Sequence, residues 1–365
     1  MKFLHVMQNE KFTAEISEFY NYYFCNGDHE ICYFLLKDES INLDNRIKSF
    51  EFIYDKSLKS RMQFLKILKN YDYIVLHSLF LDNGLKMLIK LKKLYRKIVW
   101  IEWGYDLYNW IPKGKFKFLT KPLNFFLRNN FNSVVCIFEP DVIYYKNNFP
   151  KSMSKVFYAP YCGPFIIDEY KHYSNYSRLN DTNLQNDEVY VQIGHSANTQ
   201  INHINILHML SKFKNEKIKL FIPLSYGDKN YAKKVKDVAR SLFDEDKLIF
   251  LDEFVPIEKY YEITKRIDIA IFDTDRQIAL ANIQRLIFRN VKIFLTDNSV
   301  MYDYFISKGV PIQGISLIDK LTFSEFKKCV KTDNVELFKE FIDSYSNINK
   351  RIEPWKNVYN SVIGK

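Results

Sequence analysis

The segment VWIEWGYDLYNW (residues 99–110) places two carboxylates and several large aromatic rings directly after an apolar run. Aromatic rings offer flat apolar faces to sugars, and a carboxylate such as Asp106 can accept a hydrogen bond or a proton from a hydroxyl group. Gly104 permits a tight turn between them. This combination predicts a binding site that can carry acid–base chemistry, with Asp106 and Glu102 among the candidate bases.

Other groups that can accept a proton follow apolar runs in the first half of the chain. His77 ends the run YIVLH, and Glu139 follows VVCIF. Any one of these side chains has an alternative role as a structural hydrogen-bonding group. As a set with Glu102 and Asp106 they favour chemistry, because ligands bind beyond the carboxyl ends of parallel strands.

The segment QIGHSANTQINH (residues 192–203) has the composition of a strand, a glycine turn and a helix start. Backbone N–H groups at such a turn, together with the helix dipole, suit a diphosphate. The segment lacks G-x-G-x-x-G and G-K-[ST], so an ordinary strand–turn–helix junction is the alternative. Other residues at the ends of the predicted strands in this half could contact the same ligand, and with the turn they give Gly194, His195, Ser196, Asn198, Tyr226, Arg276 and Gln277 as candidates.

Arg276 follows the apolar run IAIF and precedes a predicted helix, a suitable place for a phosphate-binding guanidinium. A surface ion pair with Asp273 or Asp275 is the alternative. These two aspartates form an Asp-x-Asp sequence that could hold Mg²⁺ or Mn²⁺. The two-halved organisation fits metal-free phosphate binding better, so we predict no metal ion and no cofactor.

The segment IPKGKFKFLTKPLNFFLRNN (residues 111–130) interleaves basic residues with phenylalanines. This pattern suits an anionic membrane surface or a lipid-pyrophosphate headgroup. One alternative is a solvated basic helix face. A nucleic-acid site is a weaker alternative, because the sequence contains no known nucleic-acid-binding module. The predicted membrane contacts are Lys113, Lys115, Lys117 and Lys121.

Composition and charge limit the class of protein. The chain has 365 residues, 47% hydrophobic and 17% aromatic, which excludes disorder and suits two domains. A net charge of +10 favours anionic partners. Five cysteines without a C-x-x-C pair indicate a reduced, cytoplasmic protein. The sequence contains no run of about 18 apolar residues, so we predict no membrane span.

Short β-branched and aromatic runs alternate with segments of helical periodicity, which predicts parallel sheets covered by helices. The expected strands are residues 2–6, 31–36, 50–54, 73–77, 98–102, 134–138, 155–159, 189–194, 219–223, 248–251, 269–272 and 292–295. Residues 168–187 are polar and without apolar period, as in a linker. We predict a first Rossmann-like domain (1–167), the linker (168–187), a second doubly wound domain (188–336) and C-terminal helices (337–365) that could return to the first domain.

The chain resembles glycosyltransferase family 56, the transferases of 4-acetamido-4,6-dideoxy-D-galactose in enterobacterial common antigen assembly. The most specific patch is WGYDLY, which is similar to the family's W-G-x-D-L-Y, and a strand ending in His matches at His77. In the second half, G-x-S…H, P-x-x-Y and R-Q correspond to Gly194, Ser196, His203, Pro223, Tyr226, Arg276 and Gln277. His195 replaces an Asn of the family, and IALAN replaces its glycine-rich run after R-Q.

The resemblance implies a GT-B fold, α/β, with two doubly wound Rossmann-like domains facing a central cleft. It implies metal-independent transfer of a Fuc4NAc-like sugar from a dTDP-sugar to an undecaprenyl-pyrophosphate-linked saccharide. The enzyme would be peripheral on the cytoplasmic face of the plasma membrane. The first domain would bind the acceptor and the second the nucleotide sugar, with Gly194, Ser196 and Arg276 around the diphosphate. The full set of donor-binding residues would be Gly194, His195, Ser196, Asn198, Pro223, Tyr226, Arg276 and Gln277. Trp103 and Tyr108, beside Gly104, would stack on acceptor sugars. Asp106 or His77 would be the base, with Glu102 in reserve.

Two alternatives stay open at this stage. One is a GT-B transferase that uses a UDP- or GDP-sugar for O-antigen or capsule. The other is a non-catalytic protein at the membrane surface that binds glycan precursors. A nucleotide-sugar epimerase shares the architecture but has no use for the basic aromatic segment.

Overall fold

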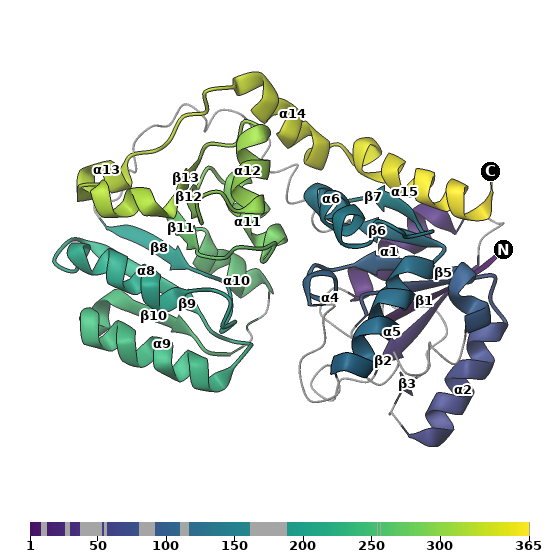
Figure 1. Cartoon of the computed structure of the whole chain (residues 1–365). Coiled ribbons are helices and arrows are strands. Elements are labelled where there is room, and N and C mark those ends of the chain that lie inside the picture. Colours follow the sequence, from purple (N-terminus) through teal and green to yellow (C-terminus); the bar gives the residue numbers. More distant parts are fainter. Residues whose placement is uncertain are drawn as a thin grey trace. The chain divides into compact units, whose positions relative to one another are not determined.

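The computed structural model describes residues 1–8, 13–25, 30–36, 53–54, 57–79, 92–109, 117–160, 188–253, 255 and 257–364. They belong to two compact units, labelled in Figure 1. The first unit comprises the described residues of Met1–Glu169 together with Asn347–Lys365, and the second those of Tyr170–Ser346. The chain therefore enters the second unit once and then returns to the first.

The first unit is built on a parallel sheet with the strand order β3-β2-β1-β4-β5-β6-β7. Its strands are β1 (Lys2–Gln8), β2 (Glu30–Leu36), β3 (Ile53–Tyr54), β4 (Tyr73–His77), β5 (Ile98–Glu102), β6 (Ser133–Cys136) and β7 (Lys155–Tyr158). The strand order reverses between β1 and β4. The carboxyl ends of these two strands therefore form the topological switch point, where ligands bind in doubly wound folds.

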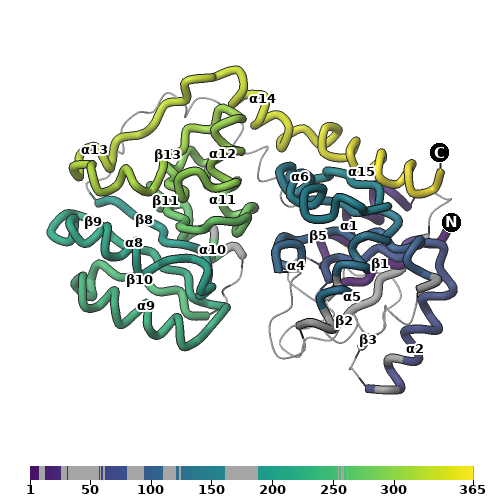
Figure 2. The backbone as a smooth tube through the Cα atoms, in the orientation of Figure 1, coloured from purple at the N-terminus to yellow at the C-terminus, as the bar shows by residue number. Residues whose placement is uncertain are grey.

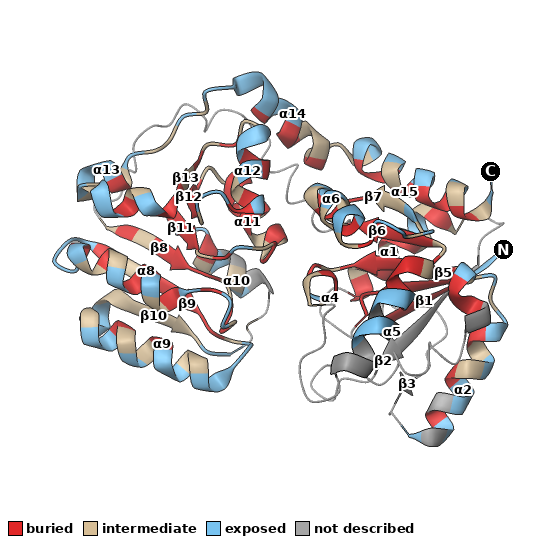
Figure 3. Cartoon of the chain, viewed as in Figure 1, coloured by how far each residue is buried: buried red, intermediate tan, exposed pale blue. Residues whose placement is uncertain are grey.

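Helices cover both faces of this sheet because successive strand side chains point to opposite sides. In β4, Ile74 and Leu76 join one buried cluster and Val75 joins the other. The helices are α1 (Thr13–Phe24), α2 (Leu58–Lys69), α4 (Tyr105–Tyr108), α5 (Lys117–Asn130), α6 (Glu139–Asn148) and α15 (Ile348–Ile363), with a 3₁₀ helix at Lys92–Lys97. Figure 3 shows the buried residues concentrated on the strands and on the helix faces toward them.

The second unit repeats the same winding with the order β10-β9-β8-β11-β12-β13, all parallel. Its strands are β8 (Val189–Ile193), β9 (Ile218–Pro223), β10 (Leu248–Leu251), β11 (Ile269–Phe272), β12 (Lys292–Leu295) and β13 (Ile312–Gly314). The helices are α8 (His203–Leu210), α9 (Lys229–Leu242), α10 (Ile257–Thr264), α11 (Leu280–Phe288), α12 (Val300–Ser307), α13 (Phe323–Lys327) and α14 (Val335–Ser346), with 3₁₀ turns at Ser211–Phe213, Glu245–Lys247 and Ile315–Lys320.

The prediction of two doubly wound parallel α/β sheets is confirmed. Each expected strand has a counterpart, although residues 137–138 lie beyond β6 and only Ile53–Tyr54 of the expected 50–54 are described. Strand β13 was not predicted, because it has only three residues and a glycine. The predicted linker, residues 168–187, lies outside the described residues.

The helical segment predicted at 337–365 is divided at Asn347, whose side chain accepts a hydrogen bond from Asn349 N and caps α15. Helix α14 belongs to the second unit and α15 to the first, where it contacts β7 (Figure 2). The indole of Trp355 donates to the carbonyl of Pro160 over 2.9 Å and is buried with Ile352 and Val358. The C-terminal helix thus completes one face of the first sheet.

Candidate functional site

The tip of β4 carries two adjacent buried polar groups, His77 and Ser78, which are 7% and 4% exposed. Nε2 of His77 lies 2.9 Å from Nδ1 of His5 on β1. Within the described part of the chain, neither Nδ1 of His77 nor the Ser78 hydroxyl has a hydrogen-bond partner. Ser78 also has φ +71°, a left-handed conformation that costs about 1–3 kcal/mol and is concentrated at functional sites. Unsatisfied groups in a strained turn indicate a ligand site.

Burial favours the neutral form of both His77 and His5. It lowers the pKa of His77 to about 3. The pKa of His5 is also well below its usual value, first because of burial and then because of the charge His77 would carry. A neutral imidazole has one donor and one acceptor nitrogen, so His77 can offer a lone pair at neutral pH.

The carboxylate of Asp106 accepts three hydrogen bonds and is 5% exposed. Leu79 N (2.8 Å) and the Trp100 indole (2.7 Å) donate to one oxygen, and Trp103 N (2.9 Å) donates to the other. The guanidinium of the buried Arg128 donates to its backbone carbonyl over 2.8 Å. This geometry favours a positioning role for Asp106, and the base role predicted for it stays a prediction.

Glu102, at the end of β5, is fully buried and accepts hydrogen bonds from the backbone segments that follow β5 and β6. Its carboxyl group accepts from Gly104 N (2.6 Å), where φ is +77°, and from Ile137 N (3.2 Å). Burial, followed by the charges of Asp141 and Asp106, holds the pKa of Glu102 well above its usual value. A raised pKa is compatible with acid–base chemistry, but both carboxyl oxygens of Glu102 already accept hydrogen bonds from backbone N–H groups.

The two rings predicted to stack on the acceptor differ in their surroundings. The Tyr108 hydroxyl donates to the buried carboxylate of Asp141, and its ring lies 4.5 Å from that of Tyr144. Trp103 is partly buried against the cluster that includes α1 and α15. Trp100, from the same segment, is a core residue with no exposed surface. Acceptor binding by Trp103, Gly104 and Tyr108 stays a prediction.

In the second unit, the turn after β8 is built around Gly194, which has φ +62°. Its N–H donates to the carbonyl of Ile271 (2.9 Å), and its carbonyl accepts from the Gln192 side chain (2.8 Å). A Cβ at this position would lie 2.6 Å from Nε2 of His203. Only glycine therefore fits this turn without displacing the histidine.

His203, the first residue of α8, matches a family motif but was not predicted as a site residue. Its Nδ1 lies 3.0 Å from the carbonyl of Ile201, so Nδ1 carries the proton and Nε2 has the lone pair. Within the described residues, Nε2 has no hydrogen-bond partner. Burial lowers the pKa of His203 to about 4. The G-x-S…H spacing was the sequence signal for this residue.

The turn after β8 is joined to the turn after β9. Ala197 N donates to the carbonyl of Tyr226 (2.8 Å), and Asp228 N donates to that of Ala197 (2.9 Å). Gly227 has φ +114°, and a Cβ there would lie 2.5 Å from the Ala197 carbonyl oxygen. The contact also brings the rings of Tyr226 and His195 to 5.9 Å. Two of the predicted donor-binding segments are therefore adjacent.

The remaining predicted donor residues lie in or beside these turns. The buried Ser196 hydroxyl is 3.3 Å from Nε2 of His195. The Asn198 side chain accepts from Gln200 N (2.9 Å), which gives it a role within its own loop. Pro223 ends β9, and Gln277 is 7% exposed beyond β11.

Arg276 connects the turn after β11 to the turn after β8. Nε of its guanidinium donates to the side-chain oxygen of Gln200 over 2.9 Å, and a second guanidinium nitrogen donates to the same atom. Asp273 instead accepts from Thr296 (2.9 Å) and Asn205 (3.0 Å). Arg276 therefore stands at the switch point between β8 and β11, linked to the loop that follows the Gly194 turn.

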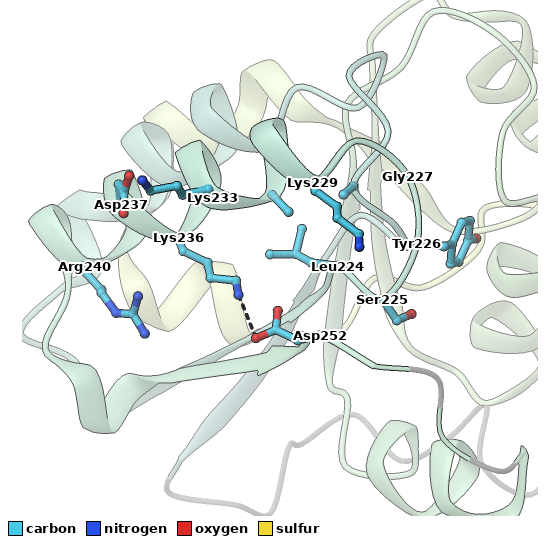
Figure 4. A pocket seen from close by; sticks show the side chains of 12 residues that line it. Leu224, Ser225, Tyr226, Gly227, Lys229, Lys233, Lys236, Asp237, Arg240 and Asp252 are labelled. Carbon is cyan, nitrogen blue, oxygen red and sulfur yellow. Dashed lines mark hydrogen bonds and ion pairs between the residues drawn. The ribbon is translucent and has the colours of Figure 1, made fainter.

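A pocket of about 460 Å³ opens beside these turns, between the end of β9 and α9 (Figure 4). Tyr226 and Gly227 line it together with a row of basic side chains from α9. One of them, Lys236, forms an ion pair with Asp252 over 2.7 Å. Among the described residues, no group of three or more His, Cys, Asp or Glu side chains could hold a metal ion.

The predicted membrane segment is described only in part. Lys113 and Lys115 lie outside the described residues, and Lys117 begins α5. Lys121 is exposed on α5, as are Phe125 (36%) and Phe126 (40%). No helix in the described ranges is both long and apolar enough to cross a bilayer.

Solved structures with this architecture include several that were determined with UDP or a UDP-sugar. Anabaena Alr3699/HepE in complex with UDP and glucose has a TM-score of 0.68 at 11% identity, covering 99% of this chain and 100% of that one. The UDP-forming α,α-trehalose-phosphate synthase of Burkholderia vietnamiensis has a TM-score of 0.60 at 6% identity, covering 100% of each chain. S. aureus MnaA with UDP has a TM-score of 0.56 at 13% identity, covering 98% of this chain and 95% of that one.

These likenesses establish the GT-B fold of the glycosyltransferases. Residues 40–343 match the family described as 4-alpha-L-fucosyltransferase, glycosyl transferase group 56, and the chain belongs to that family. The resemblance noted from WGYDLY and the His77 strand is thereby confirmed.

The hydrogen bonds of Asp106 generate a prediction about stability. In Asp106→Asn, the amide NH₂ must face at least one of three N–H donors, so the free energy of unfolding of the first unit should fall by about 1–3 kcal/mol. Thermal and urea denaturation measure this change. Glu353→Gln, at an exposed carboxylate on α15 of the same unit, is the control and should change the free energy of unfolding by no more than about 0.5 kcal/mol, because its ion pair with Lys356 is a surface contact. An Asp106→Asn protein of parental stability without transferase activity would instead support the base role.

Proposed function

We propose that this chain transfers a 4-amino-4,6-dideoxy sugar of the Fuc4NAc type from a dTDP-sugar to a lipid-linked oligosaccharide. Membership of the group 56 family over residues 40–343 is the observation that carries the proposal. The acceptor would be an undecaprenyl-pyrophosphate-linked saccharide at the cytoplasmic face of the plasma membrane. The product would serve bacterial surface polysaccharide synthesis.

On the donor side, the diphosphate would lie at the Gly194 turn. The N-terminus of α8 suits an anion there, and Arg276 supplies a permanent positive charge. A bound diphosphate would raise the pKa of His203 and turn its Nε2 into a donor. Tyr226, His195 and Gln277 would contact the rest of the nucleotide sugar. Because these groups balance the phosphate charge, we propose that no metal ion is needed.

On the acceptor side, we favour His77 as the base that removes the hydroxyl proton. Its neutral ring offers Nδ1 at the strained tip of β4, and the Ser78 hydroxyl beside it could hold the acceptor. Trp103 and Tyr108 would contact acceptor sugars. Asp106 and Glu102 would keep the turns in place through their bonds to backbone N–H groups.

A UDP-sugar donor is the second candidate. It is favoured by the likeness to HepE, which was solved with UDP-glucose at a TM-score of 0.67 and 12% identity. At this identity the likeness supports the fold rather than the base that is recognised. The family match therefore keeps dTDP first.

Nucleotide binding and product formation test the proposal. Isothermal titration with dTDP, UDP, GDP and CMP, without added metal, should give the tightest binding for dTDP. Incubation with dTDP-Fuc4NAc and a synthetic lipid-pyrophosphate disaccharide should give a trisaccharide lipid by mass spectrometry. Preference for UDP would favour the second candidate. Binding of none of the four, together with capture of the lipid acceptor, would favour a non-catalytic binding protein.

Arg276 generates a prediction about donor affinity. Arg276→Ala should raise the dissociation constant for dTDP about 10- to 100-fold, because charge-assisted hydrogen bonds contribute about 1.5–3 kcal/mol. Titration calorimetry measures the change. Arg240→Ala is the matched control, since Arg240 on α9 pairs with Glu245. A larger effect of the control would place the nucleotide in the pocket of Figure 4 instead.

The exposed part of α5 generates a prediction about membrane binding. Lys121→Glu combined with Phe125→Ser should weaken co-sedimentation with phosphatidylglycerol vesicles about fivefold or more, since a basic residue near an anionic surface contributes about 1 kcal/mol. Lys265→Glu combined with Tyr22→Ser makes the same change of charge and removes one exposed ring elsewhere, and should bind like the parent. Equal sedimentation of all three proteins would remove α5 from the membrane contact.

A further inference from the structure

Three buried side chains from three separate elements form a hydrogen-bonded row in the first unit. The Tyr359 hydroxyl of α15 lies 3.3 Å from Nε2 of His5 on β1. Nδ1 of His5 lies 2.9 Å from Nε2 of His77 at the end of β4. Their exposed fractions are 8%, 0% and 7%. The row ends at Nδ1 of His77, which has no partner among the described residues.

The row has only two consistent arrangements of its protons, because each link holds one proton and each neutral ring carries one. If Tyr359 donates to His5, then His5 donates from Nδ1 to His77, and Nδ1 of His77 carries a proton. If His77 donates from Nε2 to His5, then His5 donates from Nε2 to the Tyr359 oxygen. Only in the second arrangement does Nδ1 of His77 have the lone pair that a base requires.

We propose that His5 and Tyr359 are positioning residues that fix His77 in the Nε2–H tautomer and share the positive charge that forms when its Nδ1 accepts a proton. The inference rests on the proposed function, in which His77 is the base. The role of Tyr359 makes the C-terminal helix part of the acceptor side. A ring orientation held by buried partners is the arrangement that a base needs to stay aimed at one hydroxyl.

The proposed step moves one proton and one glycosyl group. The acceptor O–H bond breaks and its proton forms a bond to Nδ1 of His77, while the acceptor oxygen bonds to the anomeric carbon. The bond from that carbon to the diphosphate oxygen breaks, and its electron pair leaves with the nucleoside diphosphate. The new imidazolium is stabilised as its Nε2–H bonds to His5, which in turn donates to the Tyr359 oxygen. The proton is then released to water as product leaves.

The packing around the row leaves a charge on His77 little contact with solvent. The Tyr20 ring lies 4.4 Å from the His5 ring and 5.7 Å from the His77 ring, so an apolar face separates the pair from water. Burial lowers the pKa of both histidines, and a charge on His77 lowers that of His5 further. A lone imidazolium here would be poorly solvated, so its hydrogen-bonded neighbour matters.

Tyr359→Phe tests the proposal because it removes only the hydroxyl at the far end of the row. With the donor that the nucleotide panel identifies, kcat should fall about tenfold or more while KM for the nucleotide sugar stays unchanged. Trp355→Phe is the matched control. It also removes a hydrogen bond between α15 and the rest of the unit, the one to the Pro160 carbonyl, but leaves the row intact. It should keep the parental kcat.

Nitrogen-15 NMR of the histidine rings in the full chain gives a readout that needs no substrate. The parent should show both His77 and His5 protonated on Nε2, and Tyr359→Phe should shift His5 toward a mixture of tautomers. A parent with His77 protonated on Nδ1, or a Tyr359→Phe protein with parental kcat, would overturn the inference. If no nucleotide sugar is turned over, the proposed function fails, and the ring spectra still decide whether the row has the stated arrangement.

Discussion

The buried carboxylate of Asp106 is the contact on which the edge of the first sheet depends. It accepts hydrogen bonds from the segments after β4 and β5 and from the Trp100 indole, and the backbone carbonyl of the same residue receives Arg128 from α5. Loops beyond parallel strands have no ladder to satisfy their N–H groups, so a buried acceptor must do so. One side chain thereby fixes the turn that carries Ser78 and the segment that carries Trp103.

The two units hold their switch points by different means. In the first unit, side chains bind the backbone: Asp106 and Glu102 accept from amide groups, and two histidines pair at the tip of β4. In the second unit, backbone approaches backbone, with Gly194 and Gly227 at positions where a Cβ would collide. The first arrangement presents side-chain groups suited to a hydroxyl. The second leaves the start of α8 without a Cβ at Gly194, and a helix N-terminus suits phosphate, which agrees with the proposed division between acceptor and donor.

Periodicity in the sequence was sufficient to predict the two doubly wound sheets. A buried parallel strand is a short apolar run in the sequence, and this pattern does not depend on which strands it pairs with. Strand ends followed from the same runs, which is how His77 and Arg276 were identified. Their partners could not be found this way. His5 is 72 residues from His77, and Gln200 is 76 from Arg276, so only the fold brings them together.

The interpretation of the acidic residues also depended on tertiary contacts. As carboxylates, Asp106 and Glu102 are candidate bases by residue type. The sequence does not reveal that their oxygens accept hydrogen bonds from backbone N–H groups. Likewise, helical periodicity runs across Asn347, and only contacts show that α14 and α15 belong to different units. The strained backbone at Ser78 has no sequence signal, since serine carries no preference for that conformation.

The return of α15 to the first unit has a consequence for protein synthesis. Part of one apolar face of the first sheet, the part beside α1, stays uncovered until Ile352, Trp355 and Val358 have been translated, after the whole second unit. Domains usually fold in the order in which they leave the ribosome. Here the unit that is made first is completed last, so the nascent chain exposes part of an unfinished core while the second unit is translated, and chaperones can bind it during that interval.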